Sequence, residues 1–77
     1  MYASYLGYIK KAYKNHWAVG AFNVSNLEQA QAVVAAAEHL RAPVLVNTSE
    51  KAINYAGLEN LANIVKILAS LAKVPVT

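Results

Sequence analysis

The feature that most constrains this fold is a repeat of apolar runs, each followed by a helical pattern. Runs typical of strands start near Ala18 and Val44, and a third starts at Val74. One helical pattern lies in each interval between them. Parallel strands need crossovers of this kind, which are nearly always right-handed. The order therefore predicts an α/β fold with parallel strands, the beginning of a repeating strand–helix barrel.

The helical patterns are regular enough to give approximate bounds. The first covers residues 3–16, the second follows Ser25, and the third covers residues 58–73. Each has apolar residues at spacings of three and four, which predicts one face packed on a core. The predicted core faces are Tyr2, Leu6, Ile9 and Tyr13 in the first helix; Leu27, Ala30, Val33, Val34, Ala37 and Leu40 in the second; and Leu61, Ile64, Val65, Leu68 and Leu71 in the third. We interpret Tyr2, Tyr5, Tyr8 and Tyr13 as packing residues.

Local signals indicate how these elements begin and pack. The spacing of Ser25 and Glu28 predicts a capping box, in which Ser25 caps the second helix and Glu28 bonds back to it. Residues 17–23 and 44–48 are almost continuously apolar, which predicts strands buried on both faces. Gly20 within the first strand predicts a close approach of another backbone or side chain.

The composition limits the chain to one small domain at most. A chain of 77 residues has a core that rarely supplies more than ~3–5 kcal/mol. It has no cysteine, which excludes disulfides and thiolate metal sites and fits a reducing compartment. No apolar run approaches the ~20 residues of a membrane span, and no secretory signal is recognisable. We therefore expect a cytoplasmic protein.

The chain is basic, with a formal net charge of +3 and no aspartate. Lys10, Lys11 and Lys14 cluster in the first helix, where cations near the C-terminal end are favoured by the helix dipole. The simplest interpretation is a solvated helix face. A membrane-surface helix is an alternative, as is nucleic-acid binding, although little contiguous charge is present. We expect neither membrane nor nucleic acid as a partner.

Small polar residues follow the two predicted strands. Asn23 ends the first apolar run and Ser49 follows the second. In strand–helix barrels the ligand lies at the carboxyl ends of the strands, so both residues are candidate ligand contacts. Asn47 precedes Ser49 by two residues and could share its side of the strand. Glu50 is a candidate acid or base only because it follows Ser49.

Two other features carry weaker functional signals. His16 and His39 fall near helix ends and lack the paired spacing of a zinc site, so we assign no metal ligand to them. Residues 49–57 form a connection of a length that often carries binding residues, with a helical turn expected around Asn54.

A series of short blocks links the chain to a known family. The blocks are Trp17–Val24, Asn26–Glu28, Ala42–Val46, Ser49–Glu50, Tyr55–Gly57 and Val74–Val76. In this order and spacing they resemble the opening of the class II, metal-dependent ketose-bisphosphate aldolases. The resemblance covers nearly the whole chain from Leu6 onward. It fits fructose-bisphosphate and tagatose-bisphosphate aldolases equally well.

The resemblance implies a fold and an activity. The fold would be a (β/α)₈ TIM barrel, with residues 1–77 as the N-terminal fragment of a single domain. The activity would be reversible aldol cleavage of a ketose bisphosphate to dihydroxyacetone phosphate and an aldehyde, as in glycolysis. Zinc or another divalent metal would polarise the ketone as a Lewis acid. Asn23 and Ser49 match residues that help to hold the phosphorylated substrate.

The resemblance also implies which parts lie elsewhere. In the family, the third strand continues into a segment ending Asp-His, which gives the proton-transfer Asp and the first metal-binding His. The sequence stops at Thr77, before that segment, so no catalytic or metal-binding residue is assigned and the chain alone is expected to be inactive. Lys51 stands where glycine is common, so the loop after Ser49 is expected to differ in shape or phosphate preference.

Three parallel strands would leave sheet edges and apolar helix faces uncovered. We expect the rest of the barrel to cover them. The alternative is an aldolase-derived short non-catalytic module that self-associates or binds a partner through these faces. A continuation of the reading frame that encodes Asp-His soon after Thr77 would favour the barrel.

Overall fold

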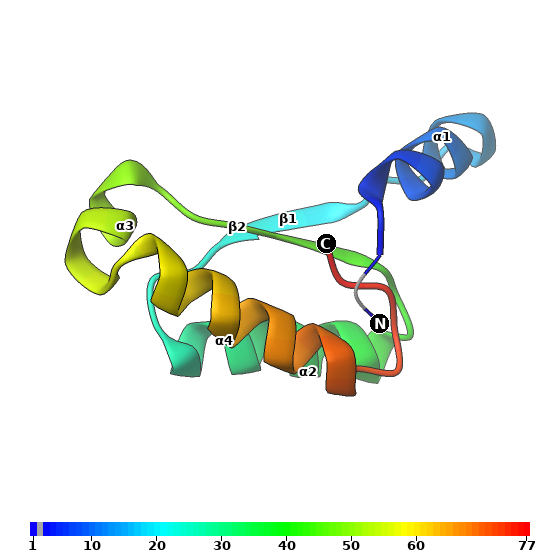
Figure 1. Cartoon of the computed structure of the whole chain (residues 1–77). Coiled ribbons are helices and arrows are strands. Elements are labelled where there is room, and N and C mark those ends of the chain that lie inside the picture. The colour runs from blue at the N-terminus through cyan, green and yellow to red at the C-terminus, as the bar shows by residue number, and fades with distance from the viewer. Residues whose placement is uncertain (2) are drawn as a thin grey trace.

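Four helices and two strands make up the computed structural model, which describes residue 1 and residues 3–77. In chain order the elements are α1 (Tyr5–Asn15), β1 (Gly20–Asn23), α2 (Leu27–Leu40), β2 (Val44–Asn47), α3 (Glu50–Ala56) and α4 (Leu58–Leu71), shown in Figure 1. The three predicted helices and the first two predicted strands are found, and the expected turn near Asn54 is a full short helix. Within the described residues, no helix is both long and apolar enough to cross a membrane.

The two strands pair in parallel over their full length. On the opposite edge of β2, Val44 forms a parallel bridge with Val76. Two hydrogen bonds accompany this bridge: the Val44 N–H donates to the Pro75 carbonyl (3.0 Å), and the Thr77 N–H donates to the Val44 carbonyl (3.1 Å). The parallel α/β arrangement is therefore confirmed, and the third strand expected at Val74 begins beside β2 as a single bridge.

The other edge of Val76 is occupied by the start of the chain. The Ala3 N–H donates to the Val76 carbonyl (3.0 Å), and the Val76 N–H donates to the Met1 carbonyl (2.7 Å). The Met1 ammonium donates to the carbonyls of Ala72 and Val74, each at 2.7 Å. Val76 is fully buried as a result.

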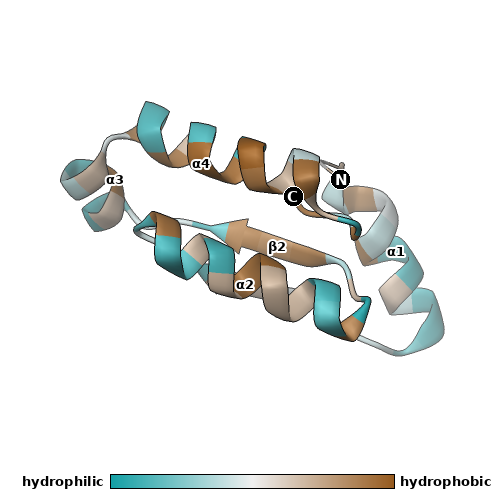
Figure 2. Cartoon of the chain, turned by 90° about the horizontal axis from the view of Figure 1, so that it is seen from below, coloured by the Kyte–Doolittle hydropathy of each residue, from teal (hydrophilic) through white to brown (hydrophobic). Residues whose placement is uncertain are grey.

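The core lies between the sheet and one layer of helices. α2 and α4 run side by side beneath β2, with their apolar sides turned toward each other and toward the strand (Figures 1 and 2). The central cluster consists of Val34, Ala37, Val44, Ala69, Ala72, Val74 and Val76. These small side chains allow the helices to approach closely, and the predicted apolar faces of α2 and α4 are confirmed in their central turns.

The cap of α2 differs from the prediction by one residue. Asn26, not Ser25, is the N-cap, and its Oδ1 accepts from the Gln29 N–H at 2.8 Å. The Gln29 side-chain oxygen accepts from both the N–H and the hydroxyl of Ser25, at 2.7 and 2.8 Å. Asparagine caps a helix as well as serine does. Because the helix begins at Leu27, Glu28 is too early to complete a capping box.

The predicted packing face of α1 is exposed. Leu6, Ile9 and Tyr13 are 51%, 39% and 87% exposed, and Ala12 is the one buried residue of this helix. The reason is position: α1 lies at the amino ends of the strands, beyond the layer formed by α2 and α4 (Figure 1). The prediction that Tyr5 and Tyr13 are packing residues is therefore wrong, because both are exposed. Tyr8 is half-buried, and Tyr2 lies outside the described residues.

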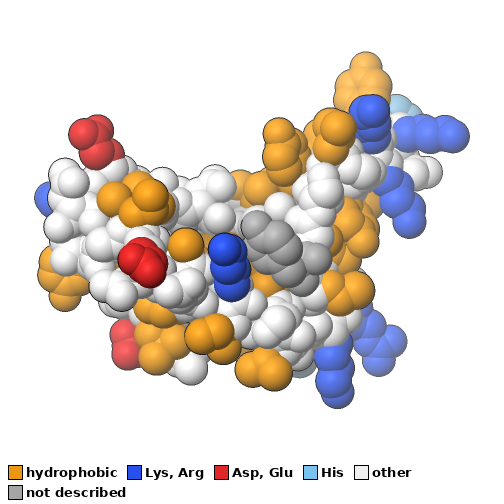
Figure 3. All heavy atoms as spheres, in the orientation of Figure 1, with side chains coloured by type: hydrophobic (Ala, Val, Ile, Leu, Met, Phe, Trp, Pro, Cys, Tyr) orange, Lys and Arg blue, Asp and Glu red, His pale blue; other side chains and the backbone are white. Residues whose placement is uncertain are grey.

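The lysines of α1 are exposed, as expected for a solvated face. Lys10, Lys11 and Lys14 all face solvent, and basic side chains gather over this helix in Figure 3. Lys14 lies in the last turn, where a cation stabilises the exposed carbonyls.

The predicted burial of the first strand is also wrong. All four residues of β1 are exposed, because this strand pairs with β2 alone and only part of α2 lies under it. β2, between two pairing segments, is buried or half-buried over its first three residues. The prediction of a close approach at Gly20 is confirmed, because a Cβ there would lie 2.7 Å from the Phe22 ring.

Helix ends are less buried than their periodicity suggests. Leu27, Leu40 and Leu71 are 41%, 72% and 74% exposed, although each belongs to a predicted core face. The last turns of the helices still contact the core, but through smaller residues: Ala37 of α2 belongs to the same buried cluster as Val44. Ala69 and Ala72 take the buried positions near the end of α4.

Candidate site at the carboxyl ends of the strands

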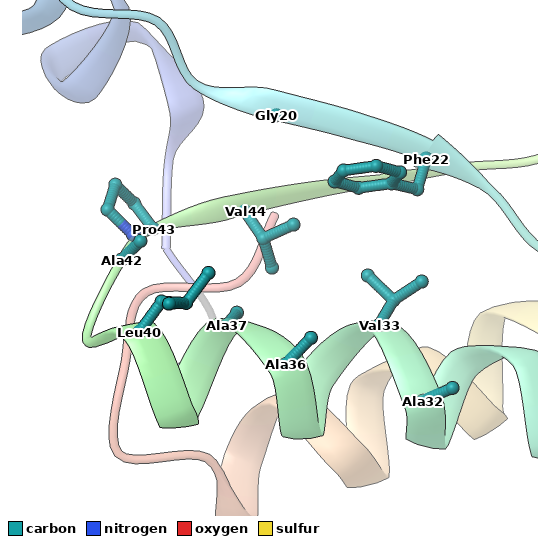
Figure 4. A pocket seen from close by; sticks show the side chains of 10 residues that line it. All are labelled: Gly20, Phe22, Ala32, Val33, Ala36, Ala37, Leu40, Ala42, Pro43 and Val44. Atoms are coloured by element: carbon teal, nitrogen blue, oxygen red, sulfur yellow. The ribbon is translucent and has the colours of Figure 1, made fainter.

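The candidate residues meet at one edge of the sheet. Asn23 and Asn47 are the last residues of β1 and β2 and are direct partners in the parallel register. Partners in a parallel register project from the same face of a sheet. Phe22, one residue before Asn23, lines the groove between β1 and α2 (Figure 4), so alternation turns both asparagines to the other face of the sheet. In a closed barrel this face is the interior.

The segments that follow the two strands are tied together. The Val24 N–H donates to the Asn47 carbonyl at 2.9 Å. The Thr48 hydroxyl donates to the Val24 carbonyl at 3.0 Å, and Val24 is buried. These two bonds hold the end of β1 against the end of β2. Thr48 was not singled out from the sequence, because a hydroxyl-to-carbonyl bond across 24 residues leaves no local pattern.

Ser49 lies just beyond this edge and begins α3. Its Oγ accepts from the Ala52 N–H at 3.1 Å, so Ser49 is the N-cap of the helix. A hydroxyl that accepts one bond still has its own proton to donate. Glu50 is exposed in the first turn of α3, where a carboxylate is favoured by the helix dipole. Ser49 and Asn23 thus lie at the same end of the parallel strands, as predicted.

A pocket of about 300 Å³ opens beside Ser49. It is lined by Ser25, Ser49, Lys51, Ala52 and Tyr55, and we refer to it as the rim pocket. Ser25 and Ser49 come from the segments after the two strands, and the other three residues come from α3. The sequence indicated Lys51 only as an unusual residue of the loop after Ser49. The pocket could not be predicted, because three of its lining residues belong to α3, which was expected only as a single helical turn.

The described residues do not form a metal site. Among them, no group of three or more His, Cys, Asp or Glu side chains lies close enough to hold a metal ion. His16 is the C-cap of α1 in a left-handed conformation, with φ of 61°, and His39 lies in the last turn of α2.

A second pocket, whose lining side chains are all apolar, lies on the helix side of the sheet. This groove has a volume of about 380 Å³ and lies between β1 and α2. Figure 4 shows Phe22 and Val44 above it and Val33, Ala36 and Leu40 below. Phe22 and Leu40 are 52% and 72% exposed. The groove has no polar side chain that could take part in chemistry.

Three relatives of the chain are named as aldolases, each for a different substrate. A 43% identical segment of 68 residues is shared with a fructose-bisphosphate aldolase of Thermus caldophilus, covering 88% of this chain and 22% of that one. A 6-phospho-5-dehydro-2-deoxy-D-gluconate aldolase of Halalkalibacterium halodurans is 39% identical over 69 residues, covering 88% and 24%. A sulfofructosephosphate aldolase of Alkalicoccus urumqiensis is 34% identical over 68 residues, also covering 88% and 24%.

A solved structure of an aldolase also has the same fold as this chain. The crystal structure of the YdjI aldolase from Escherichia coli K12 matches with a TM-score of 0.93 and 29% identity, over 99% of this chain and 30% of that chain. The chain is therefore part of a TIM-barrel fold. It spans only 22–24% of the length of the three relatives named above. The family model "Fructose-bisphosphate aldolase class-II" matches residues 3–77, and the chain belongs to that family.

Proposed function

We propose that residues 1–77 form the N-terminal part of a class II aldolase that reversibly cleaves a ketose carrying two anionic groups. The observation that carries the proposal is the register pairing of Asn23 with Asn47 at the carboxyl edge of a parallel sheet. In TIM-barrel enzymes this edge holds the active site. The family match over residues 3–77 supports the assignment and favours it over a short non-catalytic module.

The substrate class is suggested by the relatives. Their names specify a bisphosphate, a phosphorylated gluconate and a sulfonated sugar phosphate, each with an anionic group at both ends of a short sugar. Fructose 1,6-bisphosphate and tagatose 1,6-bisphosphate remain equivalent candidates. In this proposal the side chains of Asn23 and Ser49 donate hydrogen bonds to the substrate, and Asn47 lines the same face.

The chain contributes binding rather than bond cleavage. Zinc or another divalent metal would supply Lewis-acid polarisation of the ketone, but the described residues do not fit a metal site, so its ligands would come from residues after Thr77. The proton-transfer group would also come from there. The lack of cysteine fits a reducing compartment, and we place the enzyme in the cytoplasm with a role in sugar-phosphate metabolism.

A chimera tests this function. Residues 1–77 replace the matching N-terminal segment of the Thermus caldophilus fructose-bisphosphate aldolase, and cleavage of fructose 1,6-bisphosphate is measured with zinc present. We expect a folded, active enzyme within about 10-fold of the parent kcat/KM, a loss of about 1.4 kcal/mol in transition-state stabilisation. A chimera that does not fold, or folds without cleaving the substrate, contradicts the proposal. The 77-residue chain alone should not cleave the substrate.

A further inference from the structure

The two ends of the chain meet at Val76, which lies between β2 and the amino terminus (Figures 1 and 2). On one side, the bridge to Val44 joins Val76 to β2. On the other side, the Val76 N–H donates to the Met1 carbonyl (2.7 Å), and the Ala3 N–H donates to the Val76 carbonyl (3.0 Å). Val76 is fully buried, so an unpaired N–H or carbonyl there would be costly. The amino terminus therefore completes the hydrogen bonding of this residue.

The α-amino group of Met1 makes two further bonds at the end of α4. The ammonium donates to the carbonyls of Ala72 and Val74, each at 2.7 Å, in a partly buried position. Ala72 is the C-cap of α4, and the carbonyls at a helix C-terminus carry a partial negative charge. A charged donor also makes stronger hydrogen bonds than a neutral one. This end of α4 therefore favours a cation.

The sequence of α4 does not supply that cation itself. The last turn of α4, which the structure describes in full, contains no basic residue, whereas the last turn of α1 contains Lys14 and that of α2 contains His39. Lys73 follows the helix, but it is exposed. The Met1 ammonium thus takes the position at which other helices of this chain carry a basic side chain.

We propose that the carbonyls of Ala72 and Val74 form a binding site for a primary ammonium group, and that the chain fills this site with its own α-amino group. The bound ammonium holds the C-terminal segment, residues 72–77, against β2. Ala72, Val74 and Val76 belong to the central buried cluster, so release of this segment would open part of the core. The site belongs to the 77-residue chain with a free amino terminus, and it is independent of the proposed function.

The test compares three forms of the 77-residue chain made by chemical synthesis. One has the free α-amino group, one carries an N-acetyl group, and one lacks the α-amino nitrogen of Met1. The acetyl group removes the charge and adds bulk, whereas the last form removes the charge and adds none. Sucrose is added equally to all forms, because it strengthens burial without screening charge and so preserves a folded baseline.

Urea denaturation gives the equilibrium constant for unfolding of each form. We expect this constant to rise about 10-fold in both altered forms, near the lower end of the range for a hydrogen bond from a charged group, because the site is only partly buried. Equal constants in all three forms would overturn the proposal. A rise in the acetylated form alone would assign the effect to bulk and would also overturn it.

Amide hydrogen exchange locates the change within the chain. In both altered forms the amides of Val76 and Thr77 should exchange at least about 10-fold faster, because they lie in the released segment. The Ile53 amide, which donates to the Ser49 carbonyl in α3, should change less. Unchanged exchange at Val76 and Thr77 would show that the ammonium does not hold the segment.

Lys11→Gln, in the form with the free amino group, is the matched control for net charge. It removes one positive charge from an exposed position in the middle of α1. It should leave the unfolding constant and the exchange of Val76 unchanged. A rise equal to that of the altered amino termini would mean that net charge, and not the two carbonyls, causes the effect, and the proposed site would be wrong.

Discussion

Asn23 and Asn47 lie opposite each other in the parallel register of β1 and β2, each as the last residue of its strand. Two amide side chains are thereby placed next to each other on the face of the sheet opposite the groove between β1 and α2. Two further bonds, from Val24 to the Asn47 carbonyl and from Thr48 to the Val24 carbonyl, keep the strand ends together. This pair is the part of the proposed substrate site that the chain forms by itself.

Removing the Asn23 amide should weaken substrate binding in the chimera. We expect Asn23→Ala to lower kcat/KM for fructose 1,6-bisphosphate about 5-fold, because one neutral hydrogen bond contributes about 1 kcal/mol. Asn47→Ala should have an effect in the same direction. Asn63→Ala, on the exposed face of α4, is the control and should have no effect. Equal rates for Asn23→Ala and the parent chimera would remove Asn23 from the site.

Ser49 has two separable roles, one as a helix cap and one as a substrate contact. Ser49→Ala should lower the free energy of unfolding by about 1 kcal/mol, since the Ala52 N–H loses its acceptor. Ser49→Asp should keep the cap, because aspartate is an equally good N-cap, but should repel an anionic substrate and raise its KM. Chemical denaturation and steady-state kinetics of the chimera measure the two effects.

Asn26→Ala is the control for Ser49, because it removes the cap of α2 without touching the rim pocket. It should cost a similar amount of stability and leave KM unchanged. If Ser49→Asp bound the substrate as tightly as serine does, Ser49 would be a cap and nothing more.

Gly57 joins α3 to α4 with a φ of 90°, a conformation that side chains rarely adopt. Gly57→Ala should destabilise the chain by about 1–3 kcal/mol. Gly7→Ala, inside α1 with open space around its Cβ, should instead stabilise it by about 0.5–1 kcal/mol. Urea denaturation of both variants measures these changes. A neutral effect of Gly57→Ala would mean that the junction between the helices is different.

The isolated chain should self-associate through the apolar groove between β1 and α2. Phe22 and Leu40 expose large side chains there, and apolar patches of this kind are unstable in water. In sedimentation velocity, the double variant Phe22→Ser with Leu40→Gln should shift the chain toward monomer. Tyr13→Ser with Tyr55→Ser, both exposed but outside the groove, is the control. A monomeric parent chain at high concentration would contradict this expectation.

The sequence predicted the order and direction of the elements well, because apolar periodicity reports directly on helices and buried strands. It predicted burial poorly at the edges: Phe22 and Leu6 belong to apolar patterns yet are exposed in this chain. The relatives that the chain resembles are about four times as long, and we expect further elements of a complete barrel to cover these residues. Periodicity therefore describes the folding unit to which a sequence belongs, even when only part of that unit is present.

Site residues were predictable only where a strand ending could be located. Asn23 and Ser49 follow apolar runs, so their common edge followed from parallel strands, and the structure confirms that placement; their contact with substrate stays a prediction. The choice of Asn26 over Ser25 as cap was not predictable, since both residues cap well and they are adjacent. The rim pocket depends on α3, whose single turn of apolar signal was too short to define a helix face.

The most direct measurement of the central claim is complementation of a split barrel. The 77-residue chain is mixed with the remaining C-terminal part of the Thermus caldophilus aldolase and zinc, and cleavage of fructose 1,6-bisphosphate is followed. The relative's own N-terminal segment, added to the same C-terminal part, is the positive control. We predict cleavage when both parts are present and none from either part alone. An active control beside an inactive mixture with this chain would contradict the claim.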